Sequence, residues 1–225
     1  MRQRGSSISR GAFRDYAFAA ALSTRRKAAA ARPVQCGAGF APATGHGIAR
    51  AMRIFGFAGW SGSGKTTLIE RIIPRLVERG LVVSLVKHAH HTAEIDQPGK
   101  DSYRHRQAGC REVMVSSGTR WALMHELRGT SELTLPEALD RLSPCDLALV
   151  EGYKAYPIPK LEIWRDTLRK PLLCLMDPQI LAIATDSADA LPAGTADRLP
   201  VFALSDFDAV ATFVAQRATA GPLRN

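Results

Sequence analysis

Residues 53–66 read Arg-Ile-Phe-Gly-Phe-Ala-Gly-Trp-Ser-Gly-Ser-Gly-Lys-Thr, a short apolar run that leads into a glycine-rich loop. The apolar run has the length and composition of one β-strand. From residue 65 to residue 79, apolar side chains recur at helical spacing, and Gly80 follows as a stop signal. This order of elements predicts a strand, a tight turn and a helix, which together open a βαβ unit.

The turn fits the pattern G-x-x-x-x-G-K-[ST] over residues 59–66. In loops of this pattern, backbone N–H groups surround phosphate oxygens, and a lysine neutralises the charge of the β- and γ-phosphates. The helix that begins here adds the positive end of its dipole. Lys65 is therefore predicted to hold nucleotide phosphates, and Thr66 is predicted to offer its hydroxyl to Mg²⁺. The predicted nucleotide-binding residues of the loop are Gly59, Gly62, Ser63, Gly64, Lys65, Thr66 and Thr67.

The chain beyond residue 80 alternates strand and helix patterns. Residues 81–86 and 146–150 are continuous apolar runs, as expected of strands buried on both faces of a parallel sheet. Residues 160–164 alternate apolar and polar side chains, which is typical of a half-buried strand. Further strands are expected at 112–115, 121–124, 181–184 and 201–203, and helices at 135–142 and 206–217. The pattern predicts an α/β fold with a doubly wound, mostly parallel sheet of the P-loop NTPase type.

Two acidic residues follow predicted strands at the sheet edge where open α/β folds bind ligands. Glu151 comes directly after an apolar strand, and it is predicted to hold Mg²⁺, directly or through water, together with Thr66. Lys65 and Glu151 are the predicted catalytic residues: Lys65 would offset the charge that builds on the phosphates, and Glu151 would hold the Mg²⁺ that bridges them. Asp186 follows a short late strand and is predicted to accept hydrogen bonds from the N1 and N2 edge of guanine; an ordinary turn residue is the alternative.

A polar stretch from residue 87 to residue 107 follows the second strand, and its length predicts a functional loop. His88, His90 and His91 lie within four residues of one another. Their imidazoles fit a transition-metal site with Asp96, but they also fit an anion or nucleotide site, because neighbouring guanidinium groups suit phosphates. We favour the anion site over the metal site and over a solvated loop. The basic residues predicted to act with the histidines are Lys100, Arg104 and Arg106, with His105 between the arginines.

Residues 1–52 differ in composition from the rest of the chain. The formal net charge is +9 over 225 residues, and this first segment holds nine arginine and lysine residues against Asp15 alone. Residues 53–225 are therefore nearly neutral, and we expect them to form the nucleotide-binding domain. The first segment is typical of a disordered, transit-like leader or of untranslated sequence ahead of a start at Met52. A nucleic-acid-binding arm is the weaker alternative, so we expect no nucleic-acid partner.

Composition also excludes several classes of protein. No run approaches the ~18–20 apolar residues that a membrane-spanning helix needs. The four cysteines, Cys36, Cys110, Cys145 and Cys174, form no CxxC pair, so neither a zinc knuckle nor a disulfide framework is expected. A reducing cytoplasm is the expected compartment.

Five motifs in order resemble the molybdopterin-guanine dinucleotide biosynthesis protein B (MobB) family over about residues 53–215. They are GWSGSGKTTL, VKHAHH, DQPGKDSYRHRQAG, DLALVEGYK and PKLEIWR. The resemblance implies a small homodimeric protein that binds GTP with Mg²⁺, hydrolyses it weakly, and acts mainly as an adapter. The implied partner is the cytoplasmic guanylyltransferase that joins GMP to molybdopterin. As a hypothesis beyond the resemblance, the basic loop would meet the phosphate of molybdopterin. Cys110 departs from the small residue that is usual in the family, and residues 1–52 have no counterpart there.

Two other functions share the predicted architecture. A GTPase metallochaperone of the nickel-enzyme maturation type would use the histidines for Ni²⁺ or Zn²⁺. A P-loop kinase of small molecules would close an arginine-rich lid over the phosphates, and Arg104 and Arg106 fit that role as well.

Overall fold

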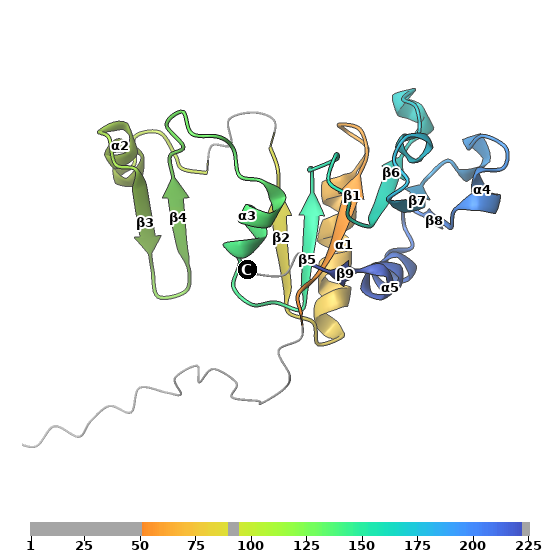
Figure 1. Cartoon of the computed structure of the whole chain (residues 1–225), viewed down its shortest axis with the longest axis horizontal. Coiled ribbons are helices and arrows are strands. Elements are labelled where there is room, and N and C mark those ends of the chain that lie inside the picture. The colour runs from red at the N-terminus through yellow and green to blue at the C-terminus, as the bar shows by residue number, and fades with distance from the viewer. Residues whose placement is uncertain (1–50, 90–94, 222–225) are drawn as a thin grey trace, which may run out of the picture. The chain divides into compact units, whose positions relative to one another are not determined.

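The computed structural model describes residues 51–89 and 95–221. The predictions for residues 1–50, and those for His90 and His91, fall outside these ranges. The described residues belong to one compact unit and form a seven-stranded sheet and a separate two-stranded sheet (Figure 1). None of the helices in these ranges has the length and apolar character needed to cross a membrane.

The main sheet is parallel along the order β2-β5-β1-β6-β7-β8. The short strand β9 pairs antiparallel with the start of β1, where the N–H of Gly221 donates to the carbonyl of Met52. This topology confirms the predicted mostly parallel α/β sheet. The strands are β1 (Arg53–Ala58), β2 (Val83–Lys87), β5 (Leu147–Glu151), β6 (Lys160–Trp164), β7 (Ile180–Thr185), β8 (Val201–Ala203) and β9 (Thr219–Ala220).

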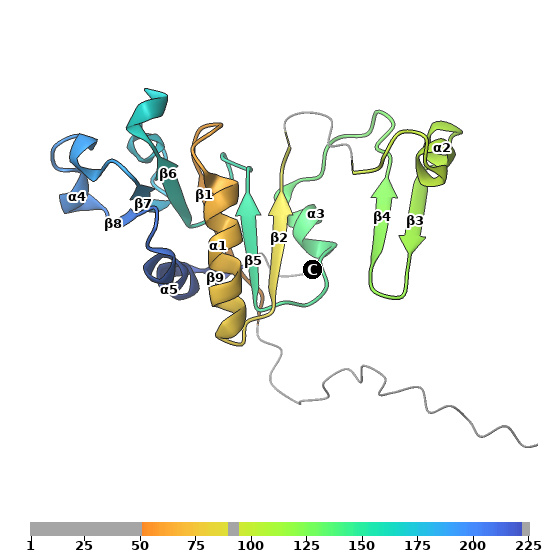
Figure 2. The same ribbon diagram turned by 180° about the vertical axis from the view of Figure 1, so that it is seen from behind.

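Helices pack on both faces of the main sheet. On one face, Phe55 and Phe57 of β1 belong to a buried cluster with α1 (Lys65–Glu78) and α5 (Phe207–Arg217). On the other face, Ile54 of β1 belongs to a second buried cluster with α3 (Leu135–Asp140). Figure 2 shows α1 in front of the sheet, and Figure 1 shows α3 on the opposite side. Both faces of β1 are thus covered, which explains why its apolar run is continuous.

The strand β2 is less buried than its sequence predicts. Val86 is 8% exposed, whereas Leu85 is 40% exposed and Val82, just before the strand, is 59% exposed. β2 ends the sheet and pairs with β5 alone among the described strands. The prediction of a strand covered on both faces was wrong, because an edge strand lacks one neighbour and part of its cover.

The strand β6 is more buried than its alternating pattern predicts. Lys160 is 2% exposed and Glu162 is 0% exposed. The ammonium of Lys160 donates to two backbone carbonyls and to Asp177, and the carboxylate of Glu162 accepts the N–H groups of residues 173 and 174. Burial raises the pKa of Glu162, and these two hydrogen bonds act in the opposite direction. The prediction of a half-buried strand was wrong, because polar side chains can be buried when they are hydrogen-bonded.

Residues 101–125 form a helix followed by a hairpin. The helix α2 (Asp101–Gln107) begins after Pro98 and Gly99, inside the stretch for which we predicted an irregular loop. The two strands predicted in this region are confirmed as β3 (Glu112–Ser116) and β4 (Trp121–His125), and they pair antiparallel with each other. The remaining short elements are η1 (Asp166–Leu168), η2 (Leu173–Leu175), η3 (Ala188–Ala190) and α4 (Thr195–Arg198).

Candidate functional site

The glycine-rich loop joins β1 to α1, and its glycines adopt backbone conformations that other residues rarely take. Gly59, Gly62 and Gly64 have φ angles of 148°, 80° and 96°. At Gly59 an added Cβ would lie 2.5 Å from the carbonyl oxygen of Ile163 and 2.7 Å from Oγ of Ser63. The loop can therefore pass close to β6 only because Gly59 has no side chain.

A cavity of about 470 Å³ opens at this loop. Its lining combines hydroxyl groups and one lysine of the loop with the last residues of β2 and β5, the two strands on one side of β1 in the sheet. Ser63, which the sequence predicts as a nucleotide-binding residue, is 1% exposed and does not line the cavity. The lining residues are Ser61, Gly62, Gly64, Lys65, Thr66, Thr67, Lys87 and Glu151.

The ammonium of Lys65 lies at the start of the loop. Its Nζ donates to the carbonyl oxygens of Gly59 at 2.9 Å and Trp60 at 2.8 Å. Burial lowers the pKa of Lys65; the carboxylate of Glu151 raises it, and the ammonium groups of Lys154 and Lys87 lower it further. Phosphate oxygens would be stronger acceptors for this ammonium than the two carbonyls.

Thr66 and Glu151 bring a hydroxyl and a carboxylate together. Oγ1 of Thr66 donates to Oε1 of Glu151 at 3.1 Å, and Glu151 is 7% exposed. Lys87, at the end of β2, places its Nζ 3.5 Å from Oε2 of Glu151 and 3.5 Å from Oγ1 of Thr66. Lys87 and Glu151 are direct neighbours in the register of β2 and β5, which brings their side chains together. The sequence analysis did not predict a role for Lys87.

Asp186 lies on the other side of the loop, after β7. Nε of Arg165 is 3.4 Å from Oδ2 of Asp186. The same guanidinium lies beside the loop, since its Nη2 is 3.4 Å from the position that a Cβ on Gly64 would occupy. Asp186 is thus linked to the loop through Arg165, which sequence reasoning also missed. Arg165 directly follows β6, and this position at the ligand-binding edge was the available signal.

The basic residues predicted around the histidines do not line the loop cavity in the described part of the chain. Nε2 of His88 lies 3.1 Å from Oε2 of Glu132, and the His88 ring contacts the ring of Tyr153. Among the described residues, no group of three His, Cys, Asp or Glu side chains could hold a metal ion.

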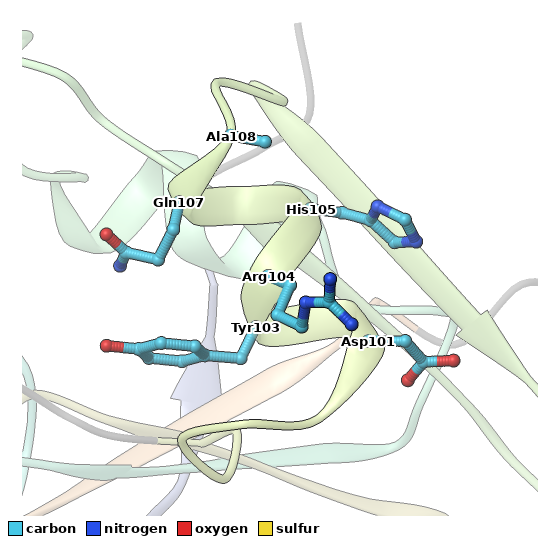
Figure 3. Close-up of a pocket in the computed structure, with 6 residues that line it drawn as sticks. All are labelled: Asp101, Tyr103, Arg104, His105, Gln107 and Ala108. Carbon is cyan, nitrogen blue, oxygen red and sulfur yellow. The ribbon is translucent and has the colours of Figure 1, made fainter.

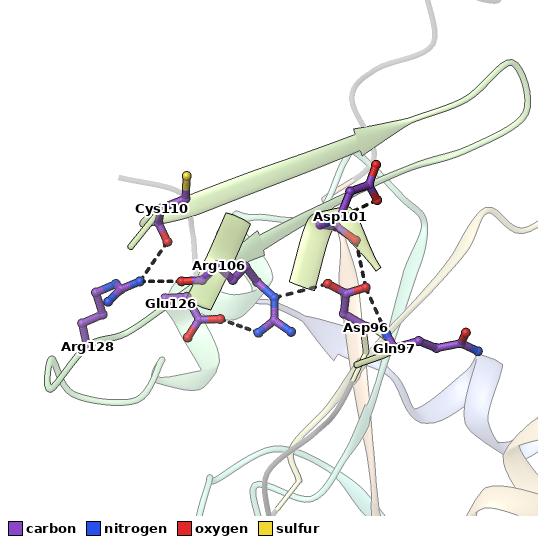
Figure 4. Close-up of polar contacts among 8 residues, drawn as sticks. Asp96, Gln97, Asp101, Arg106, Cys110, Glu126 and Arg128 are labelled. Atoms are coloured by element: carbon purple, nitrogen blue, oxygen red, sulfur yellow. Dashed lines mark hydrogen bonds and ion pairs between the residues drawn. The ribbon is translucent and has the colours of Figure 1, made fainter. Parts of the chain in front are cut away.

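The two predicted arginines of α2 have different surroundings. Arg106 donates to Glu126 at 2.5 Å and to Asp96 at 3.4 Å, so two carboxylates neutralise its charge (Figure 4). Arg104 is exposed, as is Lys100, and it lines a cavity of about 570 Å³ on α2 (Figure 3). The role of both arginines as anion ligands stays a prediction, and Arg104 is better placed for it. The lining residues of this cavity are Asp101, Tyr103, Arg104, His105, Gln107 and Ala108.

Comparisons with known proteins agree with the motifs. Residues 54–186 match the family model described as molybdopterin guanine dinucleotide synthesis protein B. The molybdopterin-guanine dinucleotide biosynthesis adapter protein of Escherichia coli K12 is 41% identical to this chain over 68% of the chain and 90% of that protein. The protein of the same name from Haemophilus influenzae is 44% identical over 59% and 74%, respectively.

A solved structure shows the same fold. The crystal structure of Bacillus subtilis MobB is 29% identical and superposes with a TM-score of 0.59, covering 75% of this chain and 99% of that one. The resemblance inferred from the motifs is therefore confirmed. With more than half of its length matched by the family model and a relative 41% identical over most of that protein's length, this chain belongs to the molybdopterin guanine dinucleotide synthesis protein B family.

Proposed function

We propose that this chain is a GTP-binding adapter that acts in the cytoplasm in molybdopterin-guanine dinucleotide synthesis. Its partner in this proposal is the guanylyltransferase that joins GMP to molybdopterin. The family membership supports the pathway and the adapter role. The observation that carries nucleotide binding is the convergence of Lys65, Thr66 and Glu151 on one cavity at a glycine-rich loop.

The donor set of the cavity fits Mg²⁺. A hydroxyl and a carboxylate are the hard oxygen ligands that this ion prefers, and Thr66 and Glu151 hold theirs 3.1 Å apart. When bound, Mg²⁺ would neutralise charge on the phosphates. Lys65 would exchange two carbonyl partners for oxygens of the β- and γ-phosphates, and Lys87 would hold the carboxylate of Glu151 in position.

Hydrolysis of GTP in this site is proposed to be slow. Fast P-loop GTPases orient the attacking water with a glutamine and stabilise the transition state with an arginine. Among the described residues, no glutamine lines the loop cavity, and Arg165, whose guanidinium lies beside the loop at Gly64, is paired with Asp186. Slow hydrolysis is consistent with an adapter whose action depends on whether GTP or GDP is bound rather than on rapid hydrolysis of GTP.

The basic surface of α2 is proposed to contact the partner or its anionic ligand. Lys100 and Arg104 are exposed there, next to the cavity of about 570 Å³. Molybdopterin carries a phosphate, and guanidinium groups bind phosphates with two parallel hydrogen bonds. This placement would leave the glycine-rich loop for the nucleotide and α2 for the pterin.

Calorimetric titration of the full chain with GTP, GDP and ATP, each with Mg²⁺, tests the proposal. We expect binding of GTP and GDP and at least tenfold weaker binding of ATP, because a carboxylate that accepts from the guanine edge is left unpaired against adenine, at a cost of about 1–3 kcal/mol. No binding of any nucleotide would contradict the proposal. Equal affinity for GTP and ATP would contradict the proposed recognition of guanine, but it would be consistent with phosphate binding by the glycine-rich loop.

Replacing Asp186 by asparagine makes the base preference measurable. The amide of Asp186→Asn presents a donor where guanine also presents donors, so GTP should bind about tenfold to hundredfold more weakly. Xanthosine triphosphate, which has a carbonyl at that edge, should bind the variant better than it binds the unaltered chain. Asp189→Asn, an exposed position on η3, is the matched control and should keep the preference for GTP. An unchanged preference in Asp186→Asn would show that another residue recognises the base.

A homodimer is proposed to form through the hairpin β3-β4. Met114 pairs with Leu123 in the register, and Trp121 lies two residues along on the same face. Their exposed fractions are 61%, 46% and 65%, respectively. Apolar faces of this kind are rarely left to solvent. Among the described strands, β3 and β4 pair only with each other, so a second copy of the chain would cover both the apolar face and an outer strand edge.

Sedimentation of Leu123→Glu tests the dimer. A carboxylate buried in an apolar interface should weaken association by about a hundredfold or more, so the variant should sediment as a monomer where the unaltered chain is a dimer. Val77→Glu is the control, because Val77 is 52% exposed but lies on α1. A monomeric unaltered chain, or a dimeric Leu123→Glu, would contradict the proposed interface.

A further inference from the structure

Trp60, the second residue of the glycine-rich loop, has two lysine side chains over its ring. Nζ of Lys154 lies 5.4 Å from the ring centroid, and Nζ of Lys170 lies 5.7 Å from it. The indole Nε1 donates to the carbonyl of Pro171 at 2.8 Å, which fixes the orientation of the ring. Both lysines are exposed, and a cation over an aromatic ring is held only weakly at an exposed position. Either ammonium can therefore leave the ring for a stronger partner.

The backbone of the same tryptophan contacts Lys65. Nζ of Lys65 donates to the carbonyl of Trp60, so one residue connects the lysine of the loop with Lys154. Of the two lysines over the ring, Lys154 is the one whose charge lowers the pKa of Lys65, in addition to the larger effect of burial. In loops of this pattern the lysine reaches the β- and γ-phosphates. The terminal phosphate of a triphosphate is thus expected beside Lys65. Lys154 lines an adjoining cavity with Ala58 rather than the loop cavity, so its side chain would have to move to reach that phosphate.

Contacts on both sides of Lys154 fix the position of its backbone. The buried ammonium of Lys160 donates to the carbonyls of Lys154 at 2.9 Å and Tyr156 at 2.6 Å. At Gly152, with φ of 106°, an added Cβ would lie 2.6 Å from Cβ of His88. These contacts fix the main chain after β5. The exposed four-carbon side chain of Lys154 can still change its position.

We propose that Lys154 is a second phosphate-binding lysine of this site, which moves from the ring of Trp60 onto the terminal phosphate of a bound nucleoside triphosphate. This inference rests on the nucleotide-binding function proposed above. A charge-assisted hydrogen bond to a phosphate oxygen is stronger than an exposed cation–π contact, so the phosphate is the preferred partner. A diphosphate presents no group at that end. Lys154 thus makes the site sensitive to the third phosphate, and the ring of Trp60 loses one cation when that phosphate binds.

Lys154→Gln and Lys170→Gln form a matched pair for the test, because each removes one of the two cations over Trp60. Calorimetry on the full chain with Mg²⁺ would use GDP and a slowly hydrolysed GTP analogue. The analogue should bind Lys154→Gln about tenfold more weakly than it binds the unaltered chain, as expected from the loss of one charge-assisted hydrogen bond. Affinity for GDP should change less than about twofold, and Lys170→Gln should bind both nucleotides as the unaltered chain does.

The emission of Trp60 gives a second readout. Trp60 is one of three tryptophans, so its signal is taken as the difference from Trp60→Phe. That difference should change with the GTP analogue but not with GDP, and the change should disappear in Lys154→Gln and persist in Lys170→Gln. An unaltered ratio of the two affinities in Lys154→Gln would overturn the role of Lys154 while the proposed function stands. Failure of the unaltered chain to bind either nucleotide would overturn the proposed function itself.

Discussion

Lys65→Ala should weaken GTP binding by about a thousandfold, since two charge-assisted hydrogen bonds to the β- and γ-phosphates are lost at about 1.5–3 kcal/mol each. In the structure, Nζ of Lys65 bonds to two loop carbonyls. These carbonyls belong to a loop that borders a cavity, so water can replace the ammonium there. We therefore expect the fold to survive the substitution while the nucleotide site fails.

Calorimetry separates these two effects. The unaltered chain, Lys65→Ala and the exposed control Lys170→Ala would be titrated with GTP and then unfolded by heat. Only Lys65→Ala should lose GTP binding, and the unfolding temperatures of all three should agree within a few degrees. GTP affinity that is unchanged in Lys65→Ala would mean that the glycine-rich loop does not bind phosphates in this chain.

Lys160→Met should destabilise the protein by about 2–3 kcal/mol, because it removes the buried partner of an ion pair whose carboxylate, that of Asp177, is 25% exposed, and leaves polar groups unpaired. Nζ of Lys160 lies 2.8 Å from Oδ2 of Asp177 and also satisfies two backbone carbonyls. Methionine fills similar space but donates no hydrogen bond. An unpaired carboxylate and two unpaired acceptors would remain near the core. A loss of this size is a large fraction of the stability of an ordinary domain.

Urea unfolding of Lys160→Met, Asp177→Asn and the double variant measures this pair. The double variant should be less destabilised than the sum of the single variants, because each single change leaves the other partner unpaired. Lys154→Met is the control on an exposed side chain and should change the free energy of unfolding by less than about 0.5 kcal/mol. A change below about 1 kcal/mol in Lys160→Met would show that water enters and replaces the ammonium.

The glycine-rich loop could be predicted from the sequence because its chemistry is local. The glycines of the turn, the lysine and the hydroxyl residue of the pattern all lie within residues 59–66. Glu151 could be found as well, since an acid after an apolar strand must lie at the ligand edge of a parallel sheet. Lys87 and Arg165 were missed because their approach to the loop depends on strand order, which places β2 and β6 near β1 although they are distant in sequence.

The wrong predictions for β2 and β6 have the same physical origin. Burial in a sheet depends on which neighbours a strand receives, so β2 looked central and is an edge strand, and β6 looked half-exposed and is covered. The sequence shows that Lys160 and Glu162 are charged. It does not show that Asp177 and two backbone N–H groups are placed to bond with them, which is what allows both to be buried. The helix α2 was missed because its seven residues carry no apolar period.

The antiparallel strand β9 holds the start of β1 at the sheet edge opposite the glycine-rich loop. Residue 221 bonds to residue 52 there, while the loop begins after residue 58 at the other end of the strand. A linker attached after residue 221 therefore starts at the edge of the sheet away from the nucleotide site. Immobilising the chain on a sensor surface through such a linker would leave the glycine-rich loop open to solution. Affinities for GTP, GDP and ATP can then be measured without blocking nucleotide entry.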